Sequence, residues 1–251
     1  MGDDSPAVRA ERNLIRSFQV WSAAAGGRAW EGAGFSCVSN PVPKRAFNHI
    51  FVTSPPARLE DVRAAITWYA ENGHPLRVRV HPEVDEEFGT LASIDLKYEG
   101  AMPGMFFRGD LTPARETGLR IDRVRDQQGL DAMIALVGRC FDWPPEHLTQ
   151  IYNRALMETP GWYAWIGYEG DEPATAGQMV VHEGTAGLYH IATTEKHRRK
   201  GHGDAITRAC MAEGFRQGCD MVTLYASALG YPVYERIGFE GAGEYLTYGP
   251  Q

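Results

Sequence analysis

Two glycines at a junction between apolar segments constrain this chain more than any other feature. Gly201 and Gly203 follow the apolar run LYHIAT, residues 188–193, and precede apolar residues that recur at helical spacing over 205–210. The first segment has the pattern of a strand and the second that of an amphipathic helix. A strand, a glycine turn and a helix in this order are typical of a sheet with helices packed on it.

The residues around these glycines predict an anion site. Glycines let backbone N–H groups converge on a small volume, and the start of a helix adds a positive dipole. The run HRRKGHG, residues 197–203, adds cationic side chains that form charge-assisted hydrogen bonds. A phosphate or pyrophosphate is therefore the expected ligand. The run contains neither the P-loop pattern nor G-x-G-x-x-G, because Ile206 stands where the latter needs its third glycine.

The length, net charge and cysteines of the whole chain limit the alternative functions. Its 251 residues predict one large or two small domains, and a net charge of −7 argues against general nucleic-acid binding. The basic run KHRRK, residues 196–200, leaves a nucleic-acid or targeting patch as a minor alternative. The four cysteines form no C-x-x-C pair and have no neighbouring histidine at zinc-ligand spacing, so we expect no metal.

The sequence also bears on location. No stretch approaches the roughly 20 apolar residues of a membrane helix. The start MGDDSP is too acidic for a signal peptide. We therefore expect a cytoplasmic protein without a membrane partner.

Periodicity predicts a mixed sheet with helices on both faces after a polar linker at residues 110–118. The order there is β-α-α-β-β-β-α-β-α-β, from the strand LRIDRV at 119–124 to a last strand near 243–248. The N-terminal half is predicted to hold helices at 7–24 and 59–73, a weak helix near 85–99, and strands within 29–54, at 76–80 and around 105–108.

Two blocks of the second half are similar to a known family. Arg198-x-x-Gly201-x-Gly203 resembles the R/Q-x-x-G-x-G/A signature of the GCN5-related N-acetyltransferases, the GNAT superfamily. About thirty residues later, LYASALGYPVYERIGFE at 224–240 resembles the family's strand, short helix and "lYeklGF"-type ending. The resemblance covers the C-terminal half and implies an α/β, mixed-sheet GNAT fold with acetyl-CoA as co-substrate.

The resemblance also implies the positions that contact acetyl-CoA. In that fold, the strand before the loop separates from its neighbour at a bulge, and its free backbone groups bind the pantetheine arm, while the loop N–H groups bind the pyrophosphate. The family often has proline where this chain has Glu195, which puts the entry to the loop in doubt. The implied cofactor-binding residues are Ile191, Ala192, Thr193, Arg198, Arg199, Lys200, Gly201, His202, Gly203, Asp204 and Ser227.

The catalytic groups are less completely specified. Tyr234 matches the family's tyrosine that faces the CoA sulfur as general acid. Since a thiol has a pKa of about 8.5 and tyrosine about 10, full proton transfer is uphill by about 2 kcal/mol, and a hydrogen bond to the developing charge can suffice. His190 is the one group between 186 and 194 expected to titrate near neutrality. It is a candidate base or water-relay residue, with a structural role as the alternative, so the base stays unassigned.

We predict a catalytic domain at 116–251 and a smaller N-terminal α/β domain at 1–115. The latter is a degenerate GNAT-like copy or an unrelated cap, and LKYEGAMPGMFFRGD at 96–110 faintly echoes VYERIGFEGAGEYLTYG at 233–249. The predicted function is acetyl-CoA-dependent N-acetylation of a primary amine by direct attack in a ternary complex. A non-catalytic acyl-CoA-binding module is the alternative. The acceptor is a small-molecule or peptide amine, and a homodimer is left open.

Overall fold

The chain forms two compact units that interleave along the sequence. The computed structural model describes residues 5–53, 58–81 and 96–250. The larger unit contains residues 1–17 and 104–242, and the smaller unit contains 18–103 and 243–251. Helix α1 (Pro6–Ala24) and strands β5 (Leu96–Phe107) and β11 (Glu240–Pro250) therefore contribute residues to both units.

The larger unit is built on a mixed sheet with the strand order β5-β10-β9-β8-β7-β6. Neighbouring strands run antiparallel except for β9 and β10, which are parallel because helix α7 connects them. The elements of this unit are β6 (Arg120–Arg123), α4 (Gln127–Phe141), α5 (Pro145–Ile151), α6 (Arg154–Met157), β7 (Trp162–Glu169), β8 (Glu172–His182), β9 (Thr185–Thr193), the 3₁₀ turn η2 (Glu195–His197), α7 (His202–Arg216), β10 (Met221–Tyr225) and α8 (Tyr231–Ile237).

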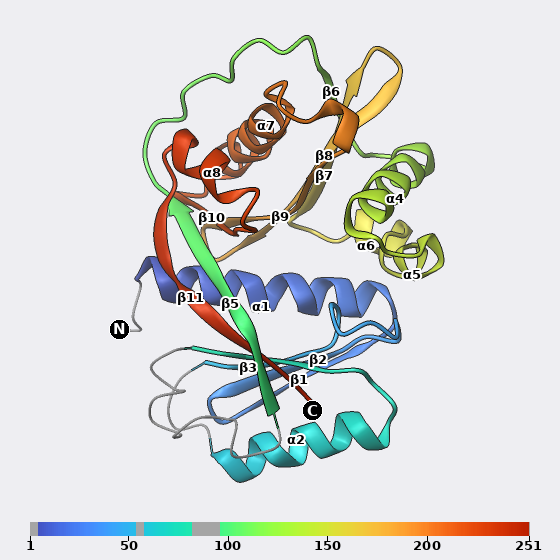
Figure 1. Ribbon diagram of the computed structural model, residues 1–251, viewed down its shortest axis with the longest axis vertical. Coiled ribbons are helices and arrows are strands. Elements are labelled where there is room, and N and C mark those ends of the chain that lie inside the picture. Colours follow the sequence, from blue (N-terminus) through green and yellow to red (C-terminus); the bar gives the residue numbers. More distant parts are fainter. Residues whose placement is uncertain (1–4, 54–57, 82–95, 251) are drawn as a thin grey trace. The chain divides into compact units, whose positions relative to one another are not determined.

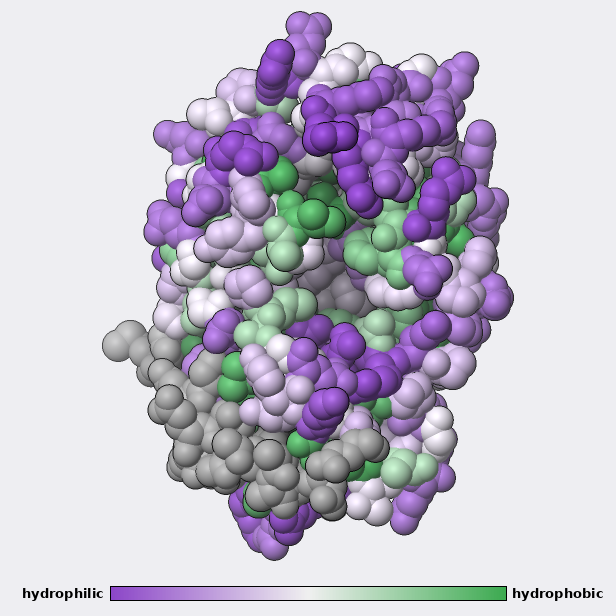
Figure 2. Space-filling model, in the orientation of Figure 1, coloured by the Kyte–Doolittle hydropathy of each residue, from purple (hydrophilic) through white to green (hydrophobic). Residues whose placement is uncertain are grey.

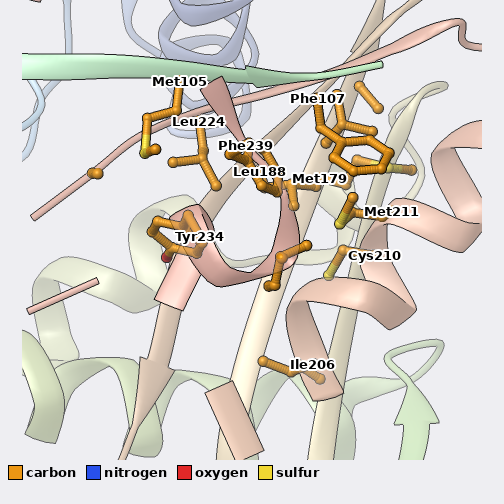
Figure 3. Packing of buried hydrophobic residues seen from close by; sticks show 14 of the residues in the cluster. Met105, Phe107, Met179, Leu188, Ile206, Cys210, Met211, Leu224, Tyr234 and Phe239 are labelled. Atoms are coloured by element: carbon orange, nitrogen blue, oxygen red, sulfur yellow. The ribbon is translucent and has the colours of Figure 1, made fainter. Parts of the chain in front are cut away.

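Helices α7 and α4 pack on opposite faces of this sheet (Figure 1). Alternation along β8 explains the arrangement, because successive side chains of a strand point to opposite faces. Met179 belongs to the core cluster that contains the apolar side chains of α7, whereas Ala176 packs with Leu136 of α4. Figure 3 shows the first cluster, in which Met211 and Cys210 of α7 lie close to the strand residues.

The smaller unit has the strand order β1-β2-β3-β4-β11. Its elements are β1 (Arg28–Gly32), β2 (Phe35–Ser39), β3 (His49–Val52), α2 (Leu59–Glu71), β4 (Arg77–Val80) and the end of β11. Strands β3 and β4 are parallel and α2 follows β3 in the chain, which forms a βαβ unit. Ile50 and Val52 join α2 in one core, while the Phe18 and Phe51 rings lie 5.4 Å apart on the alternate side.

The two units share one plan of strands. In each, consecutive antiparallel strands, β1–β3 in the smaller unit and β6–β9 in the larger, precede a helix and a parallel strand, and one more antiparallel strand pairs with that parallel strand. The final strands are exchanged between the halves of the sequence: β5 pairs with β10, and β11 pairs with β4. The strand portions of the two segments that echo each other thus pair with corresponding strands, β10 and β4, whereas residues 233–237 lie in α8. A mixed α/β fold with an additional N-terminal α/β unit is therefore confirmed.

The structure differs from the predicted elements at one place. Residues 96–99 lie in β5 and not in the weak helix expected near 85–99, and the remainder of that prediction lies outside the described residues. The division into an N-terminal domain at 1–115 and a catalytic domain at 116–251 stays a prediction. No helix within the described residues is long and apolar enough to cross a membrane.

Candidate functional site

Strands β9 and β10 separate at the carboxyl end of β9. Their parallel pairing runs from Thr185 opposite Met221 to Leu188 opposite Leu224, and goes no further in the described chain. On the other side of β9, Ala176 pairs with Ala192 and Gln178 with Tyr189, so Gly177 alone stands opposite two residues. This is a β-bulge, a device that bends a strand and redirects its backbone. Residues 189–193 of β9 therefore leave the ladder with β10, as the family resemblance implies.

His190 occupies the bulge in an unusual conformation. Its φ of 48° lies in the left-handed region, where a residue with a side chain is strained. The imidazole Nδ1 contacts both the Tyr152 hydroxyl and the Gln178 amide, and the Gln178 carbonyl accepts from Trp162 Nε1 at 2.7 Å. The ring also makes edge contacts with Phe141 and Trp143. These contacts hold the strained backbone in place.

Burial lowers the pKa of His190 to about 3, which predicts a specific pH dependence of stability. The unfolded chain binds a proton at this residue below its ordinary pKa of about 6.5, whereas the folded chain stays neutral down to about 3. Stability is therefore full above pH 6.5 and falls as pH drops from 6.5 towards 3, by at most about 1.4 kcal/mol per pH unit from this group. Urea unfolding at pH 7, 6 and 5 measures the slope. His190→Gln should have a shallower slope, and equal slopes would contradict the prediction.

The predicted anion loop has the backbone geometry expected of it. Gly201 is the N-cap of α7 with φ 85°, and Arg199 has φ 62°, so two left-handed residues stand immediately before the helix. A Cβ at Gly201 would also approach Thr117 Cγ2 to 3.1 Å. Alternating conformations of this kind turn successive N–H groups into a concavity that binds anions. The first turn of α7 adds its unpaired N–H groups and the helix dipole.

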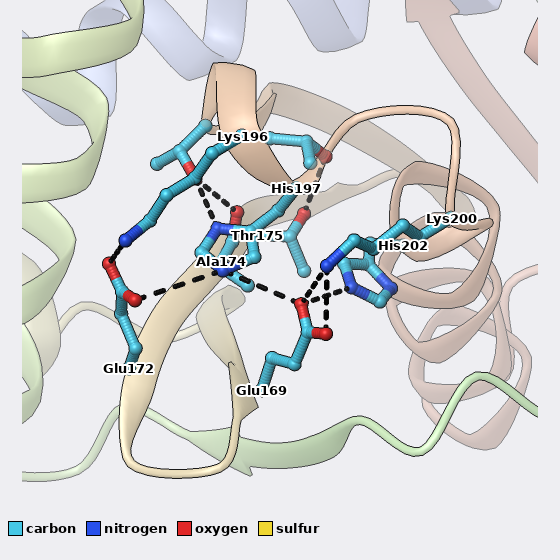
Figure 4. Close-up of polar contacts among 10 residues, drawn as sticks. Glu169, Glu172, Ala174, Thr175, Lys196, His197, Lys200 and His202 are labelled. Atoms are coloured by element: carbon cyan, nitrogen blue, oxygen red, sulfur yellow. Dashed lines mark hydrogen bonds and ion pairs between the residues drawn. The ribbon is translucent and has the colours of Figure 1, made fainter.

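Two glutamates at the turn between β7 and β8 bind side chains of the loop (Figure 4). Glu169 accepts hydrogen bonds from Lys200 Nζ at 2.8 and 2.9 Å and contacts His202 Nε2 at 3.3 Å, while Glu172 pairs with Lys196. The Lys200 ammonium and then His202 hold the pKa of Glu169 below its usual value. The side chain of Lys200 is thus directed at Glu169, so its backbone N–H is the part left for an anion.

A cavity of about 480 Å³ lies at the junction of β9, the loop, α7 and α8. Hydrophobic side chains gather on both sides of a hollow on the face shown in Figure 2. Of the predicted residues, His190 and Lys200 do not line the cavity. Those that do are Ile191, Ala192, Thr193, Arg198, Arg199, Gly201, His202, Gly203, Asp204, Ser227 and Tyr234.

Tyr234 lies on α8 at the edge of the apolar cluster (Figure 3). Burial raises the pKa of its phenol, which therefore stays protonated at neutral pH. Gly230 gives the ring its space, because a Cβ there would lie 2.8 Å from Tyr234 Cε2. Ser227 also lines the cavity, and its Oγ accepts the N–H of Gly230 at 3.2 Å, which caps the start of α8.

Sequence reasoning missed several contributors to this site. Gly177 faces the bulge, and a Cβ there would lie 2.7 Å from Ile191 Cδ1 and 3.1 Å from Cys210 Sγ. A glycine inside a strand is a known sign of a bulge, so this signal was present. Arg236, Phe141 and Leu229 also line the cavity, but no local pattern distinguishes them. The four cysteines are free thiols.

Comparison with known proteins identifies the fold. The profile of the acetyltransferase (GNAT) family matches residues 130–239, which contain the bulge, the loop and Tyr234. The chain carries a GNAT domain. No curated protein matches the chain.

Solved structures agree with this assignment. A GCN5-related N-acetyltransferase from Kribbella flavida is 15% identical with a TM-score of 0.72, over 94% of this chain and 95% of that one. Another, from Sphaerobacter thermophilus, is 14% identical with a TM-score of 0.57, over 86% and 80%. A tandem GNAT protein of the clavulanic acid biosynthesis pathway is 10% identical with a TM-score of 0.60, over 96% of each chain. At these identities the likeness concerns the fold alone, and it extends over both units of the chain.

Proposed function

We propose that this GNAT protein is an N-acetyltransferase that moves an acetyl group from acetyl-CoA to a primary amine of a small molecule or peptide in the cytoplasm. The observation that carries the proposal is the junction at β9: a strand freed from β10 by a bulge leads into a left-handed glycine loop and a helix N-terminus. That combination presents free backbone along an arm and N–H groups at its anionic end.

The residues of the cavity fit acetyl-CoA. Residues 191–193 would accompany the pantetheine arm, and the N–H groups from Arg199 to Asp204 would receive the pyrophosphate, with Arg198 and Arg199 adding charge. Gly203 supports this reading because a Cβ there would meet nothing closer than Thr193 Oγ1 at 3.7 Å. The protein itself would therefore accept a side chain at residue 203. In our proposal a phosphate of acetyl-CoA occupies that space.

In the reaction, acetyl-CoA supplies an activated thioester. The amine nitrogen forms a bond to the acetyl carbon as the carbon–sulfur bond breaks; one proton leaves the nitrogen for solvent, and the sulfur takes up one proton. Tyr234, protonated and lining the cavity, donates a hydrogen bond to the sulfur as charge develops on it. His190, with a pKa of about 3, is a weak base, so we assign most of its effect to holding the bulge.

Glycine 203 offers a test that separates ligand binding from folding. Because the family signature admits alanine at this position, Gly203→Ala should change the Kd for acetyl-CoA by less than about threefold. Gly203→Val should raise that Kd at least about tenfold because its methyl groups occupy the phosphate space, while Tm changes by only a few degrees because valine is no worse than glycine in a helix. Calorimetry and thermal melts measure the two quantities. Equal affinity of both variants would contradict a phosphate next to Gly203.

The proposed function is tested by calorimetry with acetyl-CoA at moderate ionic strength, followed by a thiol-release assay with a panel of amines. Binding and amine-dependent release of thiol would support the transferase. Tight binding without turnover of any amine would favour the non-catalytic acyl-CoA-binding module instead. Absence of binding would refute both.

A further inference from the structure

Two exposed apolar side chains line the proposed site. Among the described residues, the large hydrophobic side chains that stand exposed are Tyr98, Phe141 and Leu229. Phe141, at the end of α4, is 39% exposed, and Leu229, before α8, is 79% exposed. Both line the cavity, whereas Tyr98 does not. Apolar surface is costly to leave in water, so a bound apolar group would be stabilised between Phe141 and Leu229.

The charges around the cavity are unfavourable for a polycation. Arg198, Arg199 and Arg236 line it, and Asp204 is the one carboxylate among its described lining residues. The Asp204 carboxylate is already paired with Arg208 Nε at 3.0 Å. Because Arg198 and Arg199 are assigned to the pyrophosphate, a second ammonium on an acceptor would meet the guanidinium of Arg236 and find the one carboxylate already engaged.

The site also favours an amine that is easily deprotonated. Histidine 190 is held neutral in the bulge network and does not line the cavity, so it is not placed to take the proton from an incoming ammonium. At pH 7.5 an alkylamine with a pKa of about 10.4 is roughly 0.1% neutral, whereas an α-amino group with a pKa of about 7.8 is about one third neutral. A weakly basic amine therefore reaches the site in its reactive form far more often.

We propose that the acceptor is a weakly basic monoamine with an apolar group next to its amino group, of the α-amino amide class, and not a polyamine or an aminoglycoside. Its apolar group packs between Phe141 and Leu229. The inference rests on the proposed acetyl transfer. The neutral amine and the acetyl thioester yield an N-acetyl amide and free thiol; the nitrogen loses one proton to solvent as the sulfur takes one up, so no net proton is released.

Four amines test the two parts of this inference. Phenylalaninamide combines weak basicity with an apolar group, glycinamide lacks the apolar group, 2-phenylethylamine is more basic by about 2 pKa units, and spermidine is a polycation. With acetyl-CoA saturating at pH 7.5, kcat/KM for phenylalaninamide should exceed that for each of the others at least tenfold. Calorimetric binding of the same amines to the enzyme–CoA complex provides a readout independent of turnover, and phenylalaninamide should bind more tightly than glycinamide.

Variants of Leu229 test whether this side chain contacts the apolar group of the acceptor. Leu229→Ser should raise KM for phenylalaninamide about five- to tenfold and raise KM for glycinamide and for acetyl-CoA by a clearly smaller factor. Leu229→Asp, which adds a carboxylate, should in addition improve kcat/KM for spermidine. Tyr98→Ser is the matched control, since it removes an exposed apolar side chain that does not line the cavity, and it should change none of these values.

The outcomes separate the two proposals. A protein that fails to bind acetyl-CoA refutes the proposed function. Acetyl-CoA binding with kcat/KM highest for spermidine, or no difference between phenylalaninamide and glycinamide, overturns the acceptor class while the transferase stands. If Leu229→Ser raised only the KM for acetyl-CoA, Leu229 would contact the cofactor and not the acceptor. That result would also overturn the proposed acceptor class. Binding of acetyl-CoA without reaction of any of the four amines overturns it as well.

Discussion

Replacing Tyr234 by phenylalanine is expected to lower kcat about 100-fold, which corresponds to about 2.7 kcal/mol of transition-state stabilisation. The change removes one hydroxyl, for which the described residues provide no hydrogen bond, and leaves the ring in its place between Gly230 and Phe239. The Kd for acetyl-CoA and the Tm should therefore change little. Steady-state kinetics and calorimetry on the same preparation measure both effects.

The pH profile provides a second check on Tyr234. Because burial raises the pKa of the phenol, the protonated donor persists well into the alkaline range, and kcat should show no fall from tyrosine ionisation below about pH 10. Tyr231→Phe is the control, since Tyr231 lies on the same helix but does not line the cavity. A Tyr234→Phe enzyme with the kcat of the parent protein would rule out the donor role.

Replacing Asn13 by alanine is expected to destabilise the protein by about 3 kcal/mol. Asn13 is fully buried on α1, and its amide donates to Val180 O at 3.1 Å and to Thr185 O at 2.9 Å, while its Oδ1 accepts from the Tyr189 hydroxyl at 2.7 Å. Each buried polar group that loses its partner costs about 1–3 kcal/mol. The midpoint and slope of urea unfolding give the change in free energy.

A matched exposed residue and a neighbouring glycine make this prediction sharper. Asn72 also donates its amide to a backbone carbonyl but is exposed, so Asn72→Ala should cost less than about 0.5 kcal/mol. A Cβ at Gly187 would overlap Asn13 Oδ1, so Gly187→Ala alone should be strongly destabilising. In an Asn13→Ala background it should cost less, although the Tyr189 hydroxyl still lies 2.5 Å from that Cβ. Purely additive effects would show that Asn13 does not occupy this space.

The element pattern of the larger unit was predictable because its segments are strongly periodic. The helix over 127–141 and the short helix over 231–237 follow from apolar spacing, and the strand before the glycines follows from its composition. Prediction failed at residues 96–99, which were expected in a weak helix, whereas the strand expected around 105–108 is the end of one long strand that includes Gly100 and Pro103. Local propensity disfavours a strand at these two residues, and the pairing with β10 covers only residues 104–107.

Some features of the candidate site could likewise be predicted from the sequence, and others could not. The anion loop could be predicted because a left-handed turn requires glycine and a phosphate attracts cations, both of which are local properties. The role of His190 could not, because its side chain is held by Tyr152 and Gln178, which lie 38 and 12 positions away. The apolar lining from Phe141 and Leu229 likewise depends on two segments that meet only in the fold.

By itself, the sequence determined most of the helices and strands and the glycine turn at Gly201, and it predicts the class of anion that the turn suits. It did so because spacing, left-handed turns and charge act over a few neighbouring residues. Only the tertiary structure decided that β5 and β11 exchange places between the units, that β9 bulges at His190, and which side chains close the cavity. These features arise from pairing and packing between residues distant in the chain, whose free energies no local pattern records.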